Sequence, residues 1–351
     1  MKCFFLIEWL KNSAGTERIA TDVANGIFEM TNWEIEFITL SDDVTSFFPL
    51  LPGIKVRSIN GKISKPLQAS YKLRKLITKE KPDYVINVAT TMSRISIPAA
   101  AFTSTKVISW DHFNLYSGSK LGYIWRLCSA LFSTRTIVLT NKDRENYPRL
   151  LQHKINTIYN FPTPIKGKIS NLDSKIAIAV GRLTYQKGFD LLLSSWAKVC
   201  QTNKEWTLYI IGSGEDENKL KEQAHRLHII NRVKFIPPTN QISEYYAQAS
   251  LYIMSSRFEG FGLVLIEAKQ QGLPCISFDC PNGPNEIIRS GIDGIIIPMN
   301  DIQGMANEIS LLINNRSKIK SFGKEALADM KERFNKENII KKWIQILSQT
   351  N

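Results

Sequence analysis

The chain lacks the features that mark secreted, membrane-spanning and disulfide-rich proteins. Its 351 residues hold five cysteines, scattered, odd in number and without the spacing of a metal site. They are Cys3, Cys128, Cys200, Cys275 and Cys280. This usage excludes a disulfide framework and a zinc module, and it favours reduced thiols in a cytosolic protein. No segment approaches the roughly 18 uninterrupted apolar residues of a membrane span.

Acidic residues are scarce relative to basic ones. There are 32 Asp and Glu against 45 Lys and Arg, so the formal charge is +13. Such an excess requires an explanation, and a nucleic-acid-binding protein is one alternative. However, the chain has no zinc-finger spacing, no RNP sequence and no stripe of basic and aromatic residues. We therefore expect no nucleic-acid partner.

Much of the positive charge is local. Nine basic residues and one acid lie between Lys55 and Lys81. After Pro66 the pattern turns helical, with Ala69, Leu73, Leu76 and Ile77 on one face and lysines on another. The predicted basic patch consists of Lys72, Arg74, Lys75 and Lys79. A helix of this kind can lie against anionic lipid headgroups, and a merely solvated helix face is the open alternative.

Buried strands alternate with amphipathic helices along the whole chain. In the first half the strands are predicted within CFFLIEWL, WEIEFITL, DYVINVA, TKVISW and RTIVLT, and in the second half within IAIAVGRL, WTLYIIGSG, RVKFIP, LYIMSS and PCISFD. Continuous apolar strands separated by helices indicate parallel sheets covered on both faces. The α/β prediction is two doubly wound domains facing across a cleft, at 1–162 and 175–325. A proline-rich linker spans 163–174, and 326–351 is a helical segment that crosses back to the first domain.

Two carboxylates bracket an apolar run in SRFEGFGLVLIEAKQQG. Gly260 and Gly262 predict a tight turn, and the run 261–271 predicts a helix that stops at the glycine and proline of Gly272-Leu273-Pro274. Glu259 is then in a loop before the helix, and Glu267 is nearly two turns inside it. The free N–H groups of the helix start would form an anion site between them.

The second domain opens with a strand that runs into Gly181-Arg182 and a loop that reaches Lys187-Gly188. Ligands of doubly wound sheets bind outside the carboxyl ends of the strands. An arginine fork beside a lysine point charge suits a diphosphate. Another glycine loop, Gly212-Ser213-Gly214, lacks the third glycine of a dinucleotide fingerprint and instead allows a helix to start close by.

GRLTYQKGFD together with SRFEGFGLVLIEAKQQGLPCISFDCPNGPNEII resembles the retaining glycosyltransferases of family 4, which have the two-domain GT-B fold. Glu259 and Glu267 match the E-x7-E signature of that family. AGTERIATDVANG and SRFEGFG are most similar to the branch that builds bacterial exopolysaccharide such as amylovoran, capsule and O-antigen. The resemblance covers nearly the whole chain and is densest from Ile176 to Pro298.

The resemblance implies a role for each motif residue. Arg182 and Lys187 would hold the diphosphate of the donor, and Glu259 would bind hydroxyls of its sugar. Glu267 would accept hydrogen bonds from the ribose, as carboxylates do in dinucleotide folds. The remaining donor-binding residues would be Phe261, Gly262 and Leu263 at the helix start, and Gly15 and Thr16 after the first strand.

Asp111 and His112 follow the strand TKVISW, so they are expected at the carboxyl edge of a sheet. Related enzymes have a histidine in a similar place, and the resemblance implies that His112 positions the sugar and the acceptor hydroxyl. We predict the catalytic set His112, Arg182, Lys187 and Glu259, with no covalent nucleophile.

The expected reaction moves a hexose or N-acetylhexosamine from a nucleotide-diphosphate sugar, with UDP preferred, to a hydroxyl of a growing surface glycan. No two aspartates are spaced as D-x-D, so we expect no metal and no cofactor. The acceptor would be lipid-linked, with the enzyme bound peripherally to the inner face of the cell membrane. Alternatives are a lipopolysaccharide-core or other glycolipid transferase, a GT-B epimerase or phosphorylase, and a non-catalytic sugar-, nucleic-acid- or membrane-binding protein.

Overall fold

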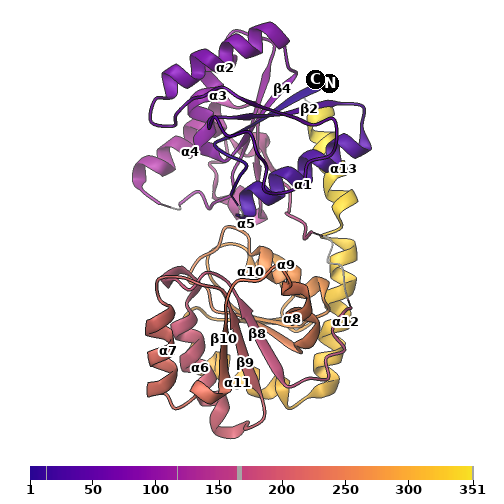
Figure 1. The fold of residues 1–351 in the computed structure, drawn as a ribbon. Helices are drawn as coiled ribbons and strands as arrows, with labels where there is room; N and C mark the ends of the chain where they lie inside the picture. Colours follow the sequence, from indigo (N-terminus) through magenta and orange to yellow (C-terminus); the bar gives the residue numbers. More distant parts are fainter. Residues whose placement is uncertain (13, 117, 164–167, 350–351) are drawn as a thin grey trace. The chain divides into compact units, whose positions relative to one another are not determined.

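A computed structural model describes residues 1–12, 14–116, 118–163 and 168–349 (Figure 1). Ser13 of the predicted turn, residues 164–167 of the predicted linker and the last two residues, 350–351, lie outside the described residues. The chain divides into two compact units. The first comprises Met1–Phe161 and Lys336–Asn351, and the second comprises Pro162–Asn335.

The first unit contains a seven-stranded parallel sheet in the order β3-β2-β1-β4-β5-β6-β7. Its strands are β1 (Lys2–Ile7), β2 (Glu34–Thr39), β3 (Lys55–Ser58), β4 (Tyr84–Val88), β5 (Lys106–Trp110), β6 (Arg135–Val138) and β7 (Ile155–Thr157). Its helices are α1 (Gly15–Met30), α2 (Pro66–Glu80), α3 (Ser93–Ala100), α4 (Lys120–Phe132), α5 (Asn141–Asn146) and α13 (Lys336–Gln349), with short 3₁₀ turns η1 (Thr90–Met92) and η2 (Gln152–Lys154).

The helices of this unit cover both faces of its sheet. On one face α2 packs on α3 and α3 on α4, and on the other α1 packs on α13 (Figure 1). The core beneath α2 and α3 is apolar, with Leu73 and Ile77 of α2 buried against Phe4 and Leu6 of β1. The predicted amphipathic pattern of α2 is therefore confirmed.

The second unit contains a six-stranded parallel sheet in the order β10-β9-β8-β11-β12-β13. Its strands are β8 (Ile176–Val180), β9 (Thr207–Ile211), β10 (Val233–Ile236), β11 (Leu251–Met254), β12 (Cys275–Phe278) and β13 (Gly294–Ile297). Its helices are α6 (Phe189–Thr202), α7 (Glu217–Arg226), α8 (Ile242–Gln248), α9 (Leu263–Gln270), α10 (Pro284–Ile287), α11 (Ile302–Ile313) and α12 (Arg316–Glu332), with 3₁₀ turns η3 (Tyr185–Lys187) and η4 (Ile230–Arg232).

The predicted α/β class with two parallel sheets is confirmed, and all ten predicted strands are present. Three further strands, β3, β7 and β13, had not been predicted. The helix predicted over 261–271 begins two residues later, at Leu263, because Gly262 adopts a left-handed conformation (φ 99°) before it. Among the described residues, no helix is both long and apolar enough to cross a bilayer.

Candidate functional site

The second sheet has a position where its strand order reverses. From β8 the chain moves outward to β9 and β10, then returns to β11 on the other side of β8. Loops that follow such a neighbouring pair leave a crevice at the carboxyl edge, where doubly wound folds bind ligands. The loop after β8 carries Arg182 and Lys187, and the loop after β11 carries Glu259.

These two loops bring one predicted cation and one predicted carboxylate into direct contact. The ammonium of Lys187 donates to Oε1 of Glu259 at 2.6 Å, and the hydroxyl of Ser256 donates to the same oxygen at 2.6 Å. The side chains of Lys187 and Glu259 are only 15% and 7% exposed. A charge pair that is largely withdrawn from water interacts more strongly than a surface pair.

Arg182 lies in the same loop as Lys187 and is exposed. Its guanidinium donates to Oε1 of Gln186 at 3.4 Å. Gln186 in turn donates to the carbonyl of Phe258, the neighbour of Glu259, at 3.1 Å. Arg182 is thus connected to the Glu259 loop through one side chain.

Close backbone approach holds the two loops together. Gly188 has a left-handed conformation (φ 61°), and a Cβ atom there would lie 2.1 Å from the carbonyl oxygen of Ser255. Only glycine fits such a position. The hydroxyl of Ser255 donates to the carbonyl of Lys187 at 2.9 Å. The backbone amide of Arg257 donates to the carbonyl of Gln186 at 2.8 Å.

A second ion pair joins the loops, and the sequence analysis missed it. Arg257 binds Asp190 with two parallel hydrogen bonds of 2.8 and 2.6 Å, and also donates to the carbonyl of Tyr185 at 2.8 Å. Its guanidinium lies 4.1 Å from the centre of the Tyr185 ring. Burial raises the pKa of Asp190, but the hydrogen bond and charge of Arg257 outweigh it and hold that pKa below its ordinary value. We call this pair the Arg257–Asp190 clamp.

The glycine loop after β9, Gly212-Ser213-Gly214, packs against the loop after β8 that carries Arg182. A Cβ atom on Gly212 would lie 1.9 Å from the carbonyl oxygen of Gly181, and one on Gly214 would lie 2.2 Å from that of Leu183. The amide of Leu183 donates to the carbonyl of Ser213 at 2.9 Å. These glycines therefore allow the β9 loop to pack directly against the loop that carries Arg182.

Glu267 lies inside α9, as predicted, and is buried. Tyr246 of α8 donates to its Oε2 at 3.4 Å. The helix is fixed from the far side by Lys269, whose fully buried ammonium binds Asp293 and Asp329. Phe261, Gly262 and Leu263 form the start of α9, where the first amide groups have no partner within a helix.

Gly15 and Thr16 open α1 directly after the β1 loop. The residue before them, Ala14, caps the helix without a side-chain hydrogen bond. Gly15 is exposed and Thr16 is half-buried. The first amides of a helix have no partner within that helix. The predicted role of Gly15 and Thr16 in donor binding stays a prediction.

Asp111 follows β5 and is almost completely buried, and its carboxylate contacts several groups. Arg126 of α4 lies 3.4 Å from its Oδ2, Tyr147 donates to the same atom at 3.3 Å, and the amide of Phe113 donates to Oδ1 at 3.2 Å. Burial raises the pKa of Asp111, although the charge of Arg126 opposes the shift. These contacts hold Asp111 in place, which fits a structural role.

His112 points to the other side of β5. Its ring lies 4.5 Å from that of Trp110, and it is buried. Burial lowers its pKa to about 3, so the imidazole is neutral. Its Nε2 atom has no hydrogen-bond partner among the described residues. A buried polar atom of this kind requires an explanation, and a ligand contact is one that fits the predicted role.

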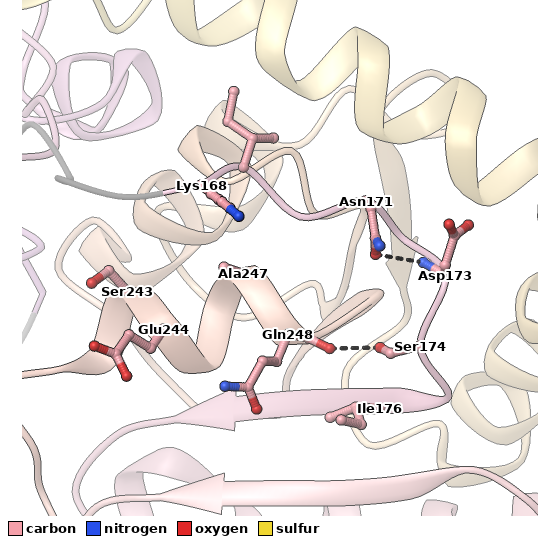
Figure 2. A pocket seen from close by; sticks show the side chains of 10 residues that line it. Lys168, Asn171, Asp173, Ser174, Ile176, Ser243, Glu244, Ala247 and Gln248 are labelled. Carbon is pink, nitrogen blue, oxygen red and sulfur yellow. Dashed lines mark hydrogen bonds between the residues drawn. The ribbon is translucent and has the colours of Figure 1, made fainter.

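One hollow among the described residues lies away from these loops. It is a groove of about 640 Å³ between α8 and the segment before β8 (Figure 2). Ser174 donates to the carbonyl of Gln248 across it at 2.6 Å. Its lining includes Lys168, Asp173 and Glu244 but none of the predicted site residues. This groove therefore does not coincide with the predicted site.

The predicted basic patch divides in two. Arg74 donates to the carbonyls of Ala99 and Ala101 at 3.2 and 2.7 Å, so it serves the packing of α2 on α3. The three lysines, Lys72, Lys75 and Lys79, instead line a hollow of about 310 Å³ with Arg57 of β3.

Several known proteins that are similar to this chain are glycosyltransferases. Residues 162–329 match the family model of the glycosyl transferases group 1. An uncharacterized glycosyltransferase of Haemophilus influenzae is 30% identical over 99% of both chains. The amylovoran biosynthesis glycosyltransferase AmsD of Erwinia amylovora is 28% identical, again over 99% of both. The solved lipopolysaccharide outer core galactosyltransferase WaaB is similar in fold, with a TM-score of 0.83 and 23% identity over 99% of this chain and 100% of that one.

Proposed function

The chain belongs to the group 1 glycosyltransferases, with the GT-B fold, and from this premise we propose what it transfers and how. The proposed reaction transfers a hexose or N-acetylhexosamine from a UDP-sugar to a hydroxyl of a bacterial surface glycan. The anomeric configuration is retained and no metal takes part.

The observation that carries this proposal is the contact of Lys187 with Glu259 at the β8–β11 switch point. A cation and a carboxylate held 2.6 Å apart offer two different functions to one ligand. The ammonium can bind a phosphate oxygen while the carboxylate accepts hydrogen bonds from sugar hydroxyls. A nucleotide-diphosphate sugar carries both groups close together, because its diphosphate is joined through one oxygen to the anomeric carbon of the sugar.

Each residue then has a physical task. Negative charge grows on the diphosphate as the sugar leaves, and Lys187, Arg182 and the amides at the start of α9 stabilise it. Glu259 orients the sugar, and Glu267 accepts from the ribose. In the same-face mechanism expected from the family, a phosphate oxygen takes the proton of the acceptor hydroxyl, so no protein nucleophile is required. His112 positions the sugar as a neutral group.

Similarity to named relatives guides the choice of acceptor. AmsD, one of the relatives that match nearly the whole chain, is named for amylovoran, an exopolysaccharide. This favours a growing exopolysaccharide, capsule or O-antigen unit, attached to a lipid, over a lipopolysaccharide core. A lipid-linked acceptor places the enzyme peripherally on the inner face of the cell membrane, where the lysines of α2 would meet anionic headgroups.

The test is to incubate the protein with a panel of UDP- and GDP-sugars and to measure release of the nucleotide diphosphate. We expect one donor to be hydrolysed slowly when no acceptor is present. Release of the nucleotide diphosphate from that donor should be faster when an acceptor is added. An epimerase would convert the sugar without release, a phosphorylase would require free phosphate, and a non-catalytic relative would bind a donor without consuming it. Absence of release with every donor and with a lipid-linked acceptor extract would contradict the proposal.

A further inference from the structure

One layer of helices in the first unit has an unusual surface. The layer consists of α2, α3 and α4, which pack in series on one face of the seven-stranded sheet (Figure 1). Helices α1 and α13 cover the opposite face and serve as an internal comparison, since both layers belong to the same unit.

Positive charge is concentrated in this layer. Helix α2 carries four cations, α3 one and α4 two, against the single acid Glu80. Glu80 is itself paired with Arg57 and Lys2. The comparison layer is balanced, with four cations and four acids over α1 and α13. The excess therefore belongs to one face of the unit and not to the unit as a whole.

Exposed apolar side chains gather in the same layer. Along α2 the outer stripe runs at intervals of four residues through Leu67, Tyr71, Lys75 and Lys79, and Leu67 is 78% exposed. The ammonium of Lys75 lies 4.6 Å from the centre of the Tyr71 ring. The large apolar residues exposed on α4 are Leu121, Ile124, Leu131 and Phe132. Among the described residues of α1 and α13, only Met30 is comparable.

Spacing places the apolar residues of α4 on one outward face. Leu121, Ile124 and Leu131 stand at intervals of three and seven residues, and α4 contains no acid. Its inner face is buried through Ser129 and Ala130. Helices with a cationic surround and exposed Leu, Ile, Phe and Tyr are typical of elements that lie in the headgroup region of a bilayer.

We propose that the α2–α3–α4 layer docks on an anionic lipid bilayer, with the outer face of α4 entering the interface. This inference rests on the proposed function, which places the acceptor in a membrane. It adds an apolar component of binding, through α4, to the electrostatic contact through α2. Contact through α2 alone would be electrostatic and screened by salt. Insertion of α4 adds an apolar component that salt does not screen.

Charge decides between a bilayer and a second copy of this chain. In a symmetric dimer through this layer, the same patch of cations would face itself, and like charges brought together oppose association. An anionic surface is complementary to the exposed cations of the layer, which are Lys75, Lys79 and Lys120. The bilayer is therefore the occupant to which the surface fits.

The experiment compares vesicle binding of full-length variants by co-sedimentation, with and without phosphatidylglycerol in phosphatidylcholine, at low and high salt. Ile124→Ser with Leu131→Ser should weaken binding by about 10²-fold at both salt concentrations, because each buried aliphatic side chain contributes roughly tenfold. Lys75→Ser with Lys79→Ser should weaken it by about 20-fold at low salt only, at roughly fivefold per lysine. Leu311→Ser on α11 and Lys198→Ser on α6 are the matched controls, both exposed residues of the second unit.

Wild-type binding by the α4 variant, with unchanged circular dichroism, would overturn the inference. So would a wild-type dimer in light scattering that this variant converts to a monomer while vesicle binding persists. Release of nucleotide diphosphate without vesicles is measured in parallel and should be equal in all variants. If the wild type binds vesicles but consumes no donor, the proposed function is contradicted. The inference that this layer docks on a bilayer would still stand.

Discussion

At the residue scale, the contact of Lys187 with Glu259 defines what a ligand must do. Each group is mostly withdrawn from water and neutralises the other. A diphosphate that approaches Lys187 adds negative charge beside Glu259, and it is tolerated only where further cations and amides share that charge. The exposed Arg182 in the same loop is the nearest such group in the sequence.

Replacement of Lys187 tests this reading. We expect Lys187→Ala to lower kcat by at least about 10²-fold, because one fixed cation opposite the developing charge is removed. The measurement is steady-state release of nucleotide diphosphate, with circular dichroism to show that the fold persists. Lys175→Ala is the control, since Lys175 pairs with Glu205 on the surface at the other end of β8. Near-normal turnover of the Lys187 variant would show that Lys187 does not contribute to catalysis.

His112 gives a pH-dependent prediction for stability. Its folded-state pKa is about 3, while an unfolded histidine titrates near 6.5. Below about pH 6.5 only the unfolded state takes up the proton, so folding free energy is lost at about 1.4 kcal/mol per pH unit. Stability is complete above that pH and falls progressively as the pH drops toward 3.

The comparison of wild type with His112→Gln isolates this effect. Between pH 6.5 and pH 5, urea unfolding should show the wild type losing about 2 kcal/mol more than the variant. The variant lacks the titrating group but keeps the size of the side chain. An equal loss in both proteins would show that the imidazole is already protonated or accessible to water.

At the scale of elements, the two loops of the proposed site are held by contacts between them and not by either loop alone. The Arg257–Asp190 clamp joins the start of α6 to the loop after β11, and Gly188 packs on Ser255 beside it. Arg257 stands two residues before Glu259, and Asp190 stands three after Lys187. The clamp therefore acts on the positions of both Lys187 and Glu259.

Loss of the clamp should impair catalysis more than folding. We expect Asp190→Asn to lower kcat/KM by roughly 10- to 10²-fold, because a displacement of about 1 Å at a reacting group has such an effect. Arg257→Lys should behave similarly, since lysine cannot form the two parallel hydrogen bonds. Hydrogen exchange of residues 181–188 should accelerate in both variants. Unchanged exchange together with lowered activity would mean that Asp190 acts directly on the ligand.

Strands with a strong hydrophobic pattern were predictable from the sequence, whereas side-chain contacts between loops were not. Most of the ten predicted strands are buried apolar runs, whereas β3 and β7 are partly exposed and β13, GIII, begins with glycine. The Lys187 and Glu259 motifs were found because loops after neighbouring parallel strands meet at one edge. The Arg257–Asp190 clamp was missed because nothing in spacing distinguishes a paired surface charge from a solvated one. The sequence feature that could have indicated the clamp is the position of Arg257 inside the motif SRFEGFG, two residues before Glu259.

At the scale of the whole molecule, the two sheets repeat one plan. Strands β3-β2-β1-β4-β5-β6 of the first have the same order as β10-β9-β8-β11-β12-β13 of the second. Each sheet therefore has its own switch point, at β1–β4 and at β8–β11. Gly15 follows β1 just as Lys187 follows β8, so the residues predicted in both halves stand at equivalent places in the two folds.

The first unit depends on a helix from the far end of the chain. Trp343 of α13 is buried and lies 4.7 Å from the ring of Trp110, and Tyr84 of β4 donates to the carbonyl of Leu347. At Gly26 of α1, a Cβ atom would lie 2.6 Å from the side chain of Ile340. The docking of α13 thus contributes directly to the core of that unit.

Trp343→Ala should destabilise the first unit by about 3–5 kcal/mol, because it leaves a cavity against Trp110 and the β5 strand. Hydrogen exchange resolves the effect by region: the amides of β1, β4 and β5 should lose protection, and those of β8 and β11 should keep it. Lys342→Ala, an exposed position on the same helix, is the control and should change neither. Equal loss of protection in both sheets would show that the two units unfold as one, and no loss in either would show that α13 is dispensable to the first.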